Sequence, residues 1–367
     1  MLKLVEFIKS HNNWEELLSQ SPYALKISRD NGYIMFKYNQ IESDFGYQLV
    51  REARGIILRE KDWKVVCRPF DKFFNYGEPN AAEIDWSHVK VTEKIDGSLV
   101  KLWWNGVWHW STNGTINARK AIANDALGVS FWNLICRGLQ ARDRFIGEFY
   151  DEIESIPNAR SKTFMFEVVS PVSRVVIPYE NYNIFYLGAR NNETGEYEEY
   201  PIFEYMRPRE WNFKSIEEVI NAANQLSWMQ EGYVVFDGVN RVKVKSPLYV
   251  EAHYMRANGA VGIERLIKIV LAHEEDEFLV YCPEYKEKIE EIKTAIHEAN
   301  ANANWLLRMF ETRGKYFSKK DFARDVVTQV SRRYQDFMFK WYDSNCTLKW
   351  EEYISNWPLS RWEQFIF

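Results

Sequence analysis

The spacing of apolar residues divides the chain into a strand-rich part and a helical part. Before residue 255, apolar and polar residues alternate in short runs bounded by turn residues, as they do in β-strands. Asn-Gly or Asp-Gly pairs between such runs predict antiparallel hairpins at 24–36, 98–111 and 232–245. The remaining runs predict strands at 55–58, 63–67, 89–93, 163–169, 174–177 and 183–188.

Longer stretches carry apolar residues at helical spacing. They predict helices at 2–20, 118–140 and 215–226, and then at 260–273, 283–311, 318–342 and 349–366. Ser246-Pro247 and Asn258-Gly259 interrupt the pattern between the two parts. We therefore predict an α+β domain over residues 1–250, with antiparallel sheets and flanking helices, followed by an all-helical domain over residues 251–367.

Composition and charge narrow the class of protein. A net charge of −5 excludes a protein held to nucleic acid by its overall charge, so any such binding needs a local basic surface. The four cysteines lie far apart and form no Cys-x-x-Cys pair, which favours reduced thiols over a zinc site or a disulfide framework. The start has no signal-peptide pattern, and no apolar run reaches the about 18 residues of a membrane span. We expect a cytoplasmic protein without a membrane segment.

The segment Lys94-Ile95-Asp96-Gly97 comes directly after a predicted strand and brings a lysine towards a pocket. A protonated amine is not a nucleophile, but burial or neighbouring cations favour its neutral form. Gly97 has no side chain, which would let a nucleotide approach the backbone, and Asp96 is suited to contact a ribose or a metal. Lys-x-Asp-Gly alone is a short motif that recurs by chance, so it indicates a function only together with the motifs C-terminal to it.

Basic residues alternate with valines along the second strand of the predicted hairpin at 232–245. Arg241, Lys243 and Lys245 therefore share one face, where two ammonium groups would stabilise developing phosphate charge. Glu231 begins the partner strand, and a carboxylate near these lysines suits a hard cation such as Mg²⁺. Taken singly, the lysines also fit the wet face of an edge strand, and Glu231 fits a loop charge.

Taken together and in order, these motifs resemble those of the covalent nucleotidyltransferases, which include ATP-dependent ligases and mRNA capping enzymes. Within that superfamily the chain resembles the bacteriophage RNA ligase 1 family over residues 35–250. The resemblance fades beyond residue 255. It rests on Ala53-Arg54-Gly55-Ile56, Arg68-Pro69-Phe70-Asp71-Lys72-Phe73-Phe74-Asn75, Lys94-Ile95-Asp96-Gly97-Ser98-Leu99, Phe166-Glu167-Val168-Val169-Ser170-Pro171 with Arg174-Val175-Val176, Glu231-Gly232-Tyr233-Val234 and Lys243-Val244-Lys245-Ser246.

The resemblance implies a nucleotidyltransferase domain that uses ATP and Mg²⁺, or Mn²⁺ in its place. Lys94 would attack ATP and carry AMP as a phosphoramide, AMP would pass to an RNA 5′-phosphate, and a 3′-hydroxyl would displace it. The implied partner is single-stranded RNA or RNA broken in a loop, such as tRNA, in RNA repair; no obligate protein partner is evident. The resemblance also implies roles for single residues. Arg54, Lys72 and Phe74 would bind ATP, Glu167 and Glu231 would contact ribose or metal, and Lys243 and Lys245 would contact the α-phosphate. Asp96 would have a catalytic role, and Gly97, Asn113 and Gly232 would lie in the nucleotide site.

The chain departs from the resemblance at Asn113. The family often carries a basic residue before the glycine of the segment that here reads Ser111-Thr112-Asn113-Gly114-Thr115. Asn113 can still hydrogen-bond a phosphate or a base. We expect Arg119 or Lys120 to supply the missing charge.

Two glutamates compete for one role. Glu148 comes after a glycine, as in a motif of the wider superfamily, but apolar residues at helical spacing around it predict a helix-surface position. Glu167 interrupts the apolar run 163–169, where a charge needs a partner. We interpret Glu167 as the working glutamate, and a structural ion pair is its alternative.

The predicted helical domain contains a basic stretch rich in aromatic residues. Residues 308–349 hold ten Lys or Arg and five acidic residues, a mixture that RNA-binding surfaces share. Amphipathic helices with aromatic cores and solvated basic faces are an equally simple interpretation. Our hypothesis is that Lys319, Lys320, Arg332 and Arg333 grip RNA.

Two other classes of protein remain open. A DNA ligase or a capping guanylyltransferase usually has an OB-fold after its paired-lysine strand, whereas residues 259–367 predict helices. An RNA-binding relative that has lost its chemistry is the other alternative, although every reactive position is retained. ATP-dependent RNA ligation is the interpretation we favour.

Overall fold

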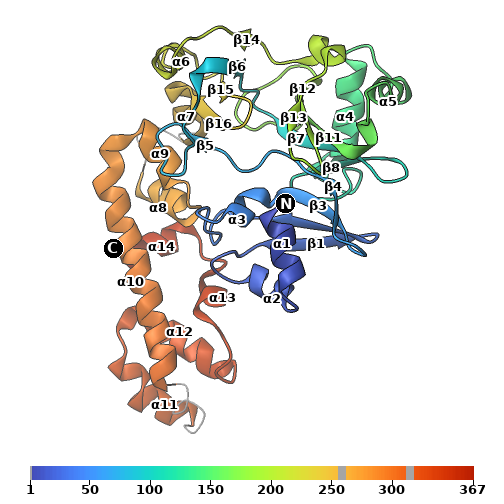
Figure 1. Cartoon of the computed structure of the whole chain (residues 1–367). Coiled ribbons are helices and arrows are strands. Elements are labelled where there is room, and N and C mark those ends of the chain that lie inside the picture. The colour runs from blue at the N-terminus through green and yellow to red at the C-terminus, as the bar shows by residue number, and fades with distance from the viewer. Residues whose placement is uncertain (1, 255–261, 311–317) are drawn as a thin grey trace. The chain divides into compact units, whose positions relative to one another are not determined.

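The structure is a computed structural model that describes residues 2–254, 262–310 and 318–367. Its contacts divide the chain into two compact units, Met1–Arg256 and Ala257–Phe367. Over the described residues, the first unit combines sheets with flanking helices, and the second contains helices and short 3-10 turns (Figure 1). The predicted α+β class with a helical part after it is confirmed. The functions assigned to the two predicted domains stay predictions.

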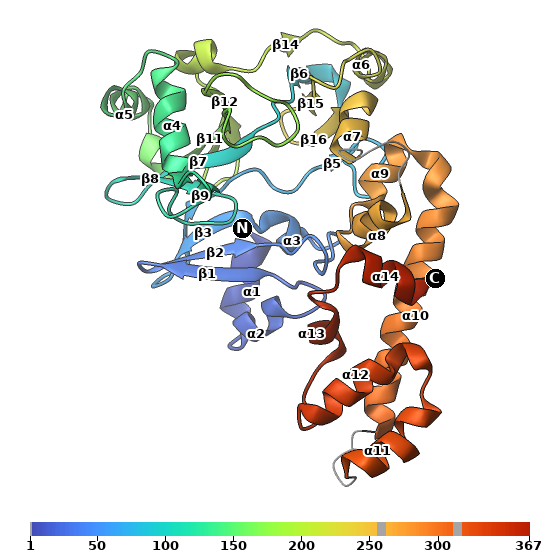
Figure 2. The ribbon, with the colours of Figure 1, turned by 180° about the vertical axis from the view of Figure 1, so that it is seen from behind.

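The N-terminal sheet has four antiparallel strands in the order β1-β2-β3-β4. Asn31 and Gly32 adopt positive φ between the first two strands, so the predicted hairpin turn is confirmed. Helices lie against the sheet in both views (Figure 1 and Figure 2), and their apolar side chains share a core with it. The elements are α1 (Lys3–Ser10), α2 (Trp14–Ser19), β1 (Lys26–Asp30), β2 (Tyr33–Lys37), α3 (Gln48–Glu52), β3 (Arg54–Arg59) and β4 (Lys64–Cys67).

A second, five-stranded antiparallel sheet, the β11 sheet, has the order β13-β12-β11-β7-β8. Two helices pack on it and share its largest apolar core. Its central strand carries Glu167, and β7 begins directly after the Lys94–Gly97 segment. The elements are β7 (Ser98–Trp104), β8 (Trp108–Thr112), α4 (Phe131–Gln140), α5 (Ile146–Glu154), β11 (Lys162–Val169), β12 (Asn183–Asn191) and β13 (Tyr197–Glu198).

The third sheet, the β6 sheet, has the order β14-β6-β15-β16-β5, with β5 parallel to β16 and the other pairs antiparallel. Strand β6 ends at Glu93, so the chain crosses from this sheet to the β11 sheet through Lys94–Gly97. That crossing positions the candidate site. The elements are β5 (Phe74–Asn75), η1 (Trp86–His88), β6 (Lys90–Glu93), β14 (Glu210–Trp211), α6 (Ile216–Ala223), β15 (Gly232–Phe236), β16 (Arg241–Lys245) and α7 (Pro247–Tyr254).

The predicted strand at 174–177 is wrong. The segment is irregular because the backbone N–H groups of Val176 and Ile177 donate to the Asp96 carboxylate rather than to a neighbouring strand. Valine and isoleucine favour strands, but a local carboxylate acceptor competes with strand pairing.

The predicted helix at 118–140 is wrong in its first half. Strands β9 (Ile122–Asn124) and β10 (Val129–Ser130) form a small ribbon there, and α4 begins only at Phe131. The start is fixed by a capping box, in which the Ser130 hydroxyl accepts from the Asn133 N–H and the Asn133 side chain binds back to Ser130. Short 3-10 turns lie further along the chain at Ala159–Ser161 and Pro201–Met206.

In the second unit, aromatic side chains form the core of the helices from α10 onward. Phe322, Phe337, Trp341 and Trp350 are buried there, so much of the aromatic content that resembled an RNA-binding surface is core. None of the helices in the described residues is long and apolar enough to cross a membrane. The elements are α8 (Ile263–Leu271), α9 (Glu275–Tyr281), η4 (Pro283–Tyr285), α10 (Lys286–Phe310), α11 (Lys319–Asp325), η6 (Val327–Gln329), α12 (Arg332–Asp343), α13 (Trp350–Ile354) and α14 (Leu359–Ile366).

Candidate active site

A cavity of about 300 Å³ lies within the first unit, lined by residues of the β6 and β11 sheets. Arg54 of β3 and Asn113, directly after β8, also line it. Its lining mixes apolar and charged side chains, as small-molecule sites usually do. The cavity is large enough for part of a nucleotide.

Lys94 enters this cavity because of the pairing between β6 and β15. Glu93 lies opposite Tyr233, and the Lys94 N–H donates to the Gly232 carbonyl at 2.8 Å. This register brings the Lys94 Nζ within 2.8 Å of Glu231 Oε2. The amine is held in an ion pair, and that contact would have to open for the amine to act as a nucleophile.

Glu231 is a buried carboxylate shared by two lysines. Its side chain is 5% exposed, and its Oε1 lies 3.5 Å from Lys245 Nζ. Because Gly232 pairs with Lys245 across the hairpin, the expected approach of Glu231 to the lysine strand is present. Lys243 lies on the same face, opposite Val234, and neither lysine of this strand is among the residues that line the cavity. From the sequence we expected cations around Lys94. The structure shows that its nearest charged partner is the carboxylate of Glu231.

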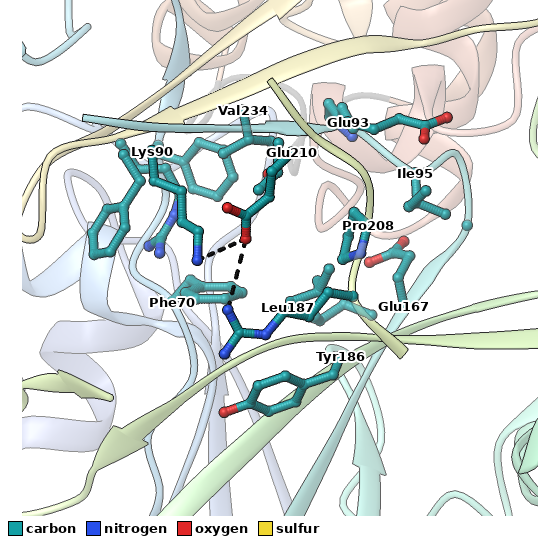
Figure 3. Close-up of a pocket in the computed structure, with 18 of the residues that line it drawn as sticks. Phe70, Lys90, Glu93, Ile95, Glu167, Tyr186, Leu187, Pro208, Glu210 and Val234 are labelled. Carbon is teal, nitrogen blue, oxygen red and sulfur yellow. Dashed lines mark ion pairs between the residues drawn. The ribbon is translucent and has the colours of Figure 1, made fainter. Parts of the chain in front are cut away.

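Glu167 lines the cavity from β11, whereas Glu148 does not. Burial raises the pKa of Glu167 to about 8, although the nearby Lys94 ammonium opposes this shift. Figure 3 places its carboxylate across the cavity from Lys90 and Glu210. Glu148 is exposed on α5, where it accepts a hydrogen bond from the Phe145 N–H. The helix-surface position predicted for Glu148 is confirmed.

Asp96 is buried and is not among the residues that line the cavity. Its Oδ2 accepts hydrogen bonds from the N–H groups of Val176 and Ile177, at 2.9 and 2.6 Å. Its Oδ1 accepts a 2.8 Å hydrogen bond from the Tyr249 hydroxyl of α7. The ribose or metal contact expected for Asp96 stays a prediction. In the described structure, the carboxylate ties the Lys94 segment to a loop and a helix.

Gly97 and Gly232 are required by close backbone packing. A Cβ at Gly97 would lie 2.5 Å from the Val168 carbonyl oxygen and 2.9 Å from the Glu167 Cγ. A Cβ at Gly232, whose φ is +139°, would lie 2.1 Å from the Val244 carbonyl oxygen. Gly97 also lines the cavity. The absence of its side chain therefore leaves room for β11 as well as for a ligand in the cavity.

Arg54 and Asn113 present buried polar atoms without protein partners. Arg54 Nη1 and Asn113 Oδ1 are buried and make no hydrogen bond within the described structure. The Arg54 guanidinium lies 5.1 Å above the centre of the Phe73 ring. Orphaned buried polar atoms are rare, so these two atoms leave hydrogen-bonding capacity beside one cavity for a polar ligand or water. These atoms fit the phosphate and base groups of a nucleotide.

Lys72 and Phe74 line a second cavity rather than the first. The Lys72 ammonium lies 5.0 Å from the centre of the Phe45 ring and 5.5 Å from those of Tyr38 and Phe74. Phe73 and Arg241 line both cavities and so separate them. The ATP-binding residues predicted from sequence are thus divided between two adjoining cavities.

An ion-pair network at one end of the first cavity was not predicted. Lys90 Nζ lies 2.6 Å from Glu199 Oε2 and 2.7 Å from Glu210 Oε1. Arg207 pairs with Glu199 at 2.9 Å, and Figure 3 shows Lys90 and Glu210 facing each other. Residues 199–210 carry no motif or strong periodicity, so only the fold brings these charges together.

The carboxylates of Glu167 and Glu231 suit a metal ion that binds together with a substrate. No cluster of three or more potential ligands among His, Cys, Asp and Glu occurs in the described residues. Glu167 and Glu231 are close enough to interact electrostatically. Mg²⁺ in phosphate-binding enzymes typically combines one or two carboxylates with water and substrate phosphates. The donor set therefore suits Mg²⁺ or Mn²⁺ bound together with a nucleotide.

A family model described as RNA ligase matches residues 52–249, which include Lys94, Glu167, Glu231 and Lys245. The chain belongs to this RNA ligase family, and the resemblance found in the sequence is confirmed.

Relatives of this chain bear related names. It is 33% identical over 295 residues to a protein of Autographa californica nuclear polyhedrosis virus, named provisionally as a bifunctional polynucleotide kinase/RNA ligase; the match covers 75% of this chain and 41% of that protein. It is 26% identical over 373 residues to an RNA ligase of Rhodothermus phage RM378, covering 85% and 83%. A solved archaeal ATP-dependent RNA ligase matches with a TM-score of 0.42 and 16% identity, over 76% of each chain.

Proposed function

We propose that this protein is an ATP-dependent RNA ligase that joins a 5′-phosphate to a 3′-hydroxyl. In the first step Lys94 Nζ attacks the α-phosphorus of ATP, an N–P bond forms, the bond to the β-phosphate oxygen breaks, and pyrophosphate leaves. In the second, an oxygen of the RNA 5′-phosphate displaces Lys94 and takes AMP. In the third, the RNA 3′-hydroxyl loses its proton, attacks the 5′-phosphorus and releases AMP. Positioning and charge stabilisation account for most of such catalysis.

The observation that carries this proposal is the convergence of Lys94, Glu231 and Lys245 inside the segment matched by the RNA ligase family. Glu231 holds the nucleophile in place before a nucleotide binds. A phosphate that enters brings negative charge, with which both ammonium groups can interact in place of Glu231. Lys245, and Lys243 on the same face, would then stabilise the charge that develops on the α-phosphate oxygens.

A divalent cation is part of the proposal. Glu167 and Glu231 would hold Mg²⁺ or Mn²⁺, which would neutralise phosphate charge when bound. Burial raises the pKa of Glu167 to about 8, so a cation would have to compete with a proton at this carboxylate.

Sealing of RNA in vitro tests the proposal. The substrate is a 5′-phosphorylated single-stranded RNA or a tRNA cut in its anticodon loop, with ATP and Mg²⁺. We expect a sealed product and a transient RNA-adenylate from the wild-type protein, and neither from Lys94→Ala. A protein that binds the RNA but consumes no ATP would be the catalytically inert relative. Preferential sealing of nicked DNA, or GMP transfer to a 5′-diphosphate, would support a DNA ligase or a capping enzyme instead.

The helical unit would contribute to RNA binding in this proposal. Lys319, Lys320, Arg332 and Arg333 are all exposed, which supports a role as a basic surface. Lys319 also pairs with Asp343 at 2.7 Å, so part of its charge is neutralised. Tyr316 and Phe317, which belong to the same aromatic and basic stretch of the sequence, lie outside the described residues. We place the reaction in the cytoplasm, the host's if the gene is carried by a phage, with RNA repair as its purpose.

A further inference from the structure

The charge that Asn113 lacks does not come from the two residues that the sequence suggested. The Arg119 guanidinium stacks 3.7 Å from the Trp132 ring centre. Lys120 Nζ is paired with Asp30 at 2.8 Å. Neither residue lines the nucleotide cavity. A phosphate near Asn113 therefore needs a different cation.

Lys37 lies on the other side of the Asn113–Gly114 turn. It is the last residue of β2 and the cross-strand partner of Arg54 in β3. A Cβ added to Gly114 would lie 3.6 Å from the Lys37 Nζ, so the ammonium already rests against this turn. Cross-strand partners project to the same face, where their side chains can act together. Lys37 thus extends the positive charge of Arg54 along the turn.

Lys101 adds a third cation beneath the same turn. It is fully buried in β7, and its Nζ donates a 2.7 Å hydrogen bond to the Gly55 carbonyl. Gly55 touches the turn closely, because a Cβ there would lie 2.8 Å from the Asn113 carbonyl oxygen. Burial lowers the pKa of Lys101 to about 8, and the charges of Arg54 and Lys37 contribute to this shift. The three cations are close enough to repel one another.

No carboxylate forms an ion pair with this cluster within the described part of the chain, although Glu167 is close enough to attract Arg54. Lys37, Arg54 and Lys101 form no ion pair there with Asp or Glu, although most other basic residues around the cavity are paired. The orphaned Arg54 Nη1 lies in the same cluster. Gathered like charges cost free energy unless an anion binds among them. The cluster is therefore built for an anionic ligand.

We propose that Lys37 binds the terminal phosphates of ATP together with Arg54 and supplies the charge that Asn113 lacks. This inference rests on the proposed function, because it assumes that Lys94 attacks the α-phosphate. Lys94 and Lys245 already occupy the α-phosphate end of the site. Lys37 belongs to another sheet and is exposed, so it meets the part of the nucleotide that leaves as pyrophosphate. Its charge stabilises the leaving group as the bridging bond breaks.

Removal of the Lys37 charge tests this inference. The measured quantity is the ATP concentration that gives half-maximal labelling of the protein by α-labelled ATP. We would compare it between Lys37→Ser and the wild type. Loss of a charge-assisted hydrogen bond predicts about a 10- to 100-fold increase in that concentration. Lys9→Ser is the control, because Lys9 is exposed on α1 and does not line the cavity, and its replacement removes the same charge. Its ATP dependence should equal that of the wild type.

Two further measurements separate a phosphate contact from a structural role. AMP binding and the sealing of pre-adenylylated RNA need no terminal phosphate, so Lys37→Ser should retain both. Adding Asn113→Lys to Lys37→Ser should restore the wild-type ATP dependence. An unchanged ATP dependence in Lys37→Ser, or an equal loss of AMP and ATP binding, would overturn this inference alone. Absence of any labelling in the wild type would overturn the proposed function first.

Discussion

The Lys94 amine lies 2.8 Å from the Glu231 carboxylate, although the two residues are far apart in the sequence. Pairing of β6 with β15 produces this contact. Lys94 directly follows Glu93, which lies opposite Tyr233 of β15, and Glu231 directly precedes β15. Lys245 reaches the other carboxylate oxygen from β16. The three residues form a unit in which one carboxylate holds two cations. In the reaction we propose, a phosphate would bind to these two cations.

Replacing Glu231 with Gln should slow adenylylation of Lys94 strongly. Gln keeps the volume but removes the charge that holds both lysines and would bind a cation. Loss of one preorganised electrostatic group typically costs about 100-fold in rate, and a single-turnover experiment with α-labelled ATP measures it. Glu148→Gln is the control, because that carboxylate is exposed on α5. Equal rates for both variants would show that Glu231 has no part in the chemistry.

Glu167 should make the stability of the protein depend on pH. Burial raises its pKa from 4.5 to about 8, so between these values the folded protein holds a proton that the unfolded chain has lost. Stability conferred by that proton is complete below the lower value and is lost as pH rises through the upper one. Glu167→Gln carries no such group.

Denaturant unfolding at about pH 5 and about pH 9 checks this prediction. Relative to the wild type, the Gln variant should gain up to about 4 kcal/mol in free energy of unfolding between these two conditions. A constant difference between the two proteins would mean that the carboxyl ionises at its ordinary pH.

The Tyr249 hydroxyl should matter for stability more than for nucleotide chemistry. Tyr249→Phe removes one of the three hydrogen bonds that the Asp96 carboxylate accepts within the described residues, and it leaves the two from Val176 and Ile177. A buried hydrogen bond to a charged group contributes about 1.5–3 kcal/mol, so the unfolding temperature should fall by several degrees. Labelling of Lys94 at a temperature where the variant is folded should stay near the wild-type level. A large loss of labelling without a loss of stability would contradict the structural role of Asp96.

Gly97→Ala should damage both stability and activity. Its Cβ would lie 2.5 Å from the Val168 carbonyl, a backbone atom that cannot move aside cheaply. Overpacking of this kind costs about 1–3 kcal/mol and would displace Glu167. Gly147→Ala is the matched control, because a Cβ there meets nothing within 4 Å and alanine favours its helix. Thermal unfolding of both variants provides the comparison, and equal stabilities would contradict the close packing.

The sequence predicted the parts of the structure that depend on local pattern and pairing. The hairpin at 232–245 could be predicted from Asp237-Gly238 and alternation, and this was enough to bring Glu231 to Lys245. The strand 174–177 was wrongly predicted because propensity does not reveal a carboxylate acceptor such as Asp96. Lys37 could not be identified, since an exposed lysine at a strand end carries no signal until β2 and the Asn113–Gly114 turn meet in space.

The separation of Lys72 and Phe74 from Lys94 was likewise invisible to motif order. Motif order shows that Lys72 and Phe74 precede Lys94 in the chain. It does not show that Phe73 and Arg241 line both cavities and lie between them. The Lys90 ion-pair network also depends on the third dimension, because Glu199 and Glu210 reach it from different segments. Residue types indicated the chemistry of the site, but they did not reveal which side chains would become its partners.

Peptide mapping by mass spectrometry after incubation with ATP and Mg²⁺ tests the central claim most directly. We expect one adenylyl group on the peptide that contains Lys94, removed by added pyrophosphate or by a 5′-phosphorylated RNA acceptor. An unmodified Lys94 peptide under conditions where the protein binds ATP, or an adenylyl group on another lysine, would contradict the account.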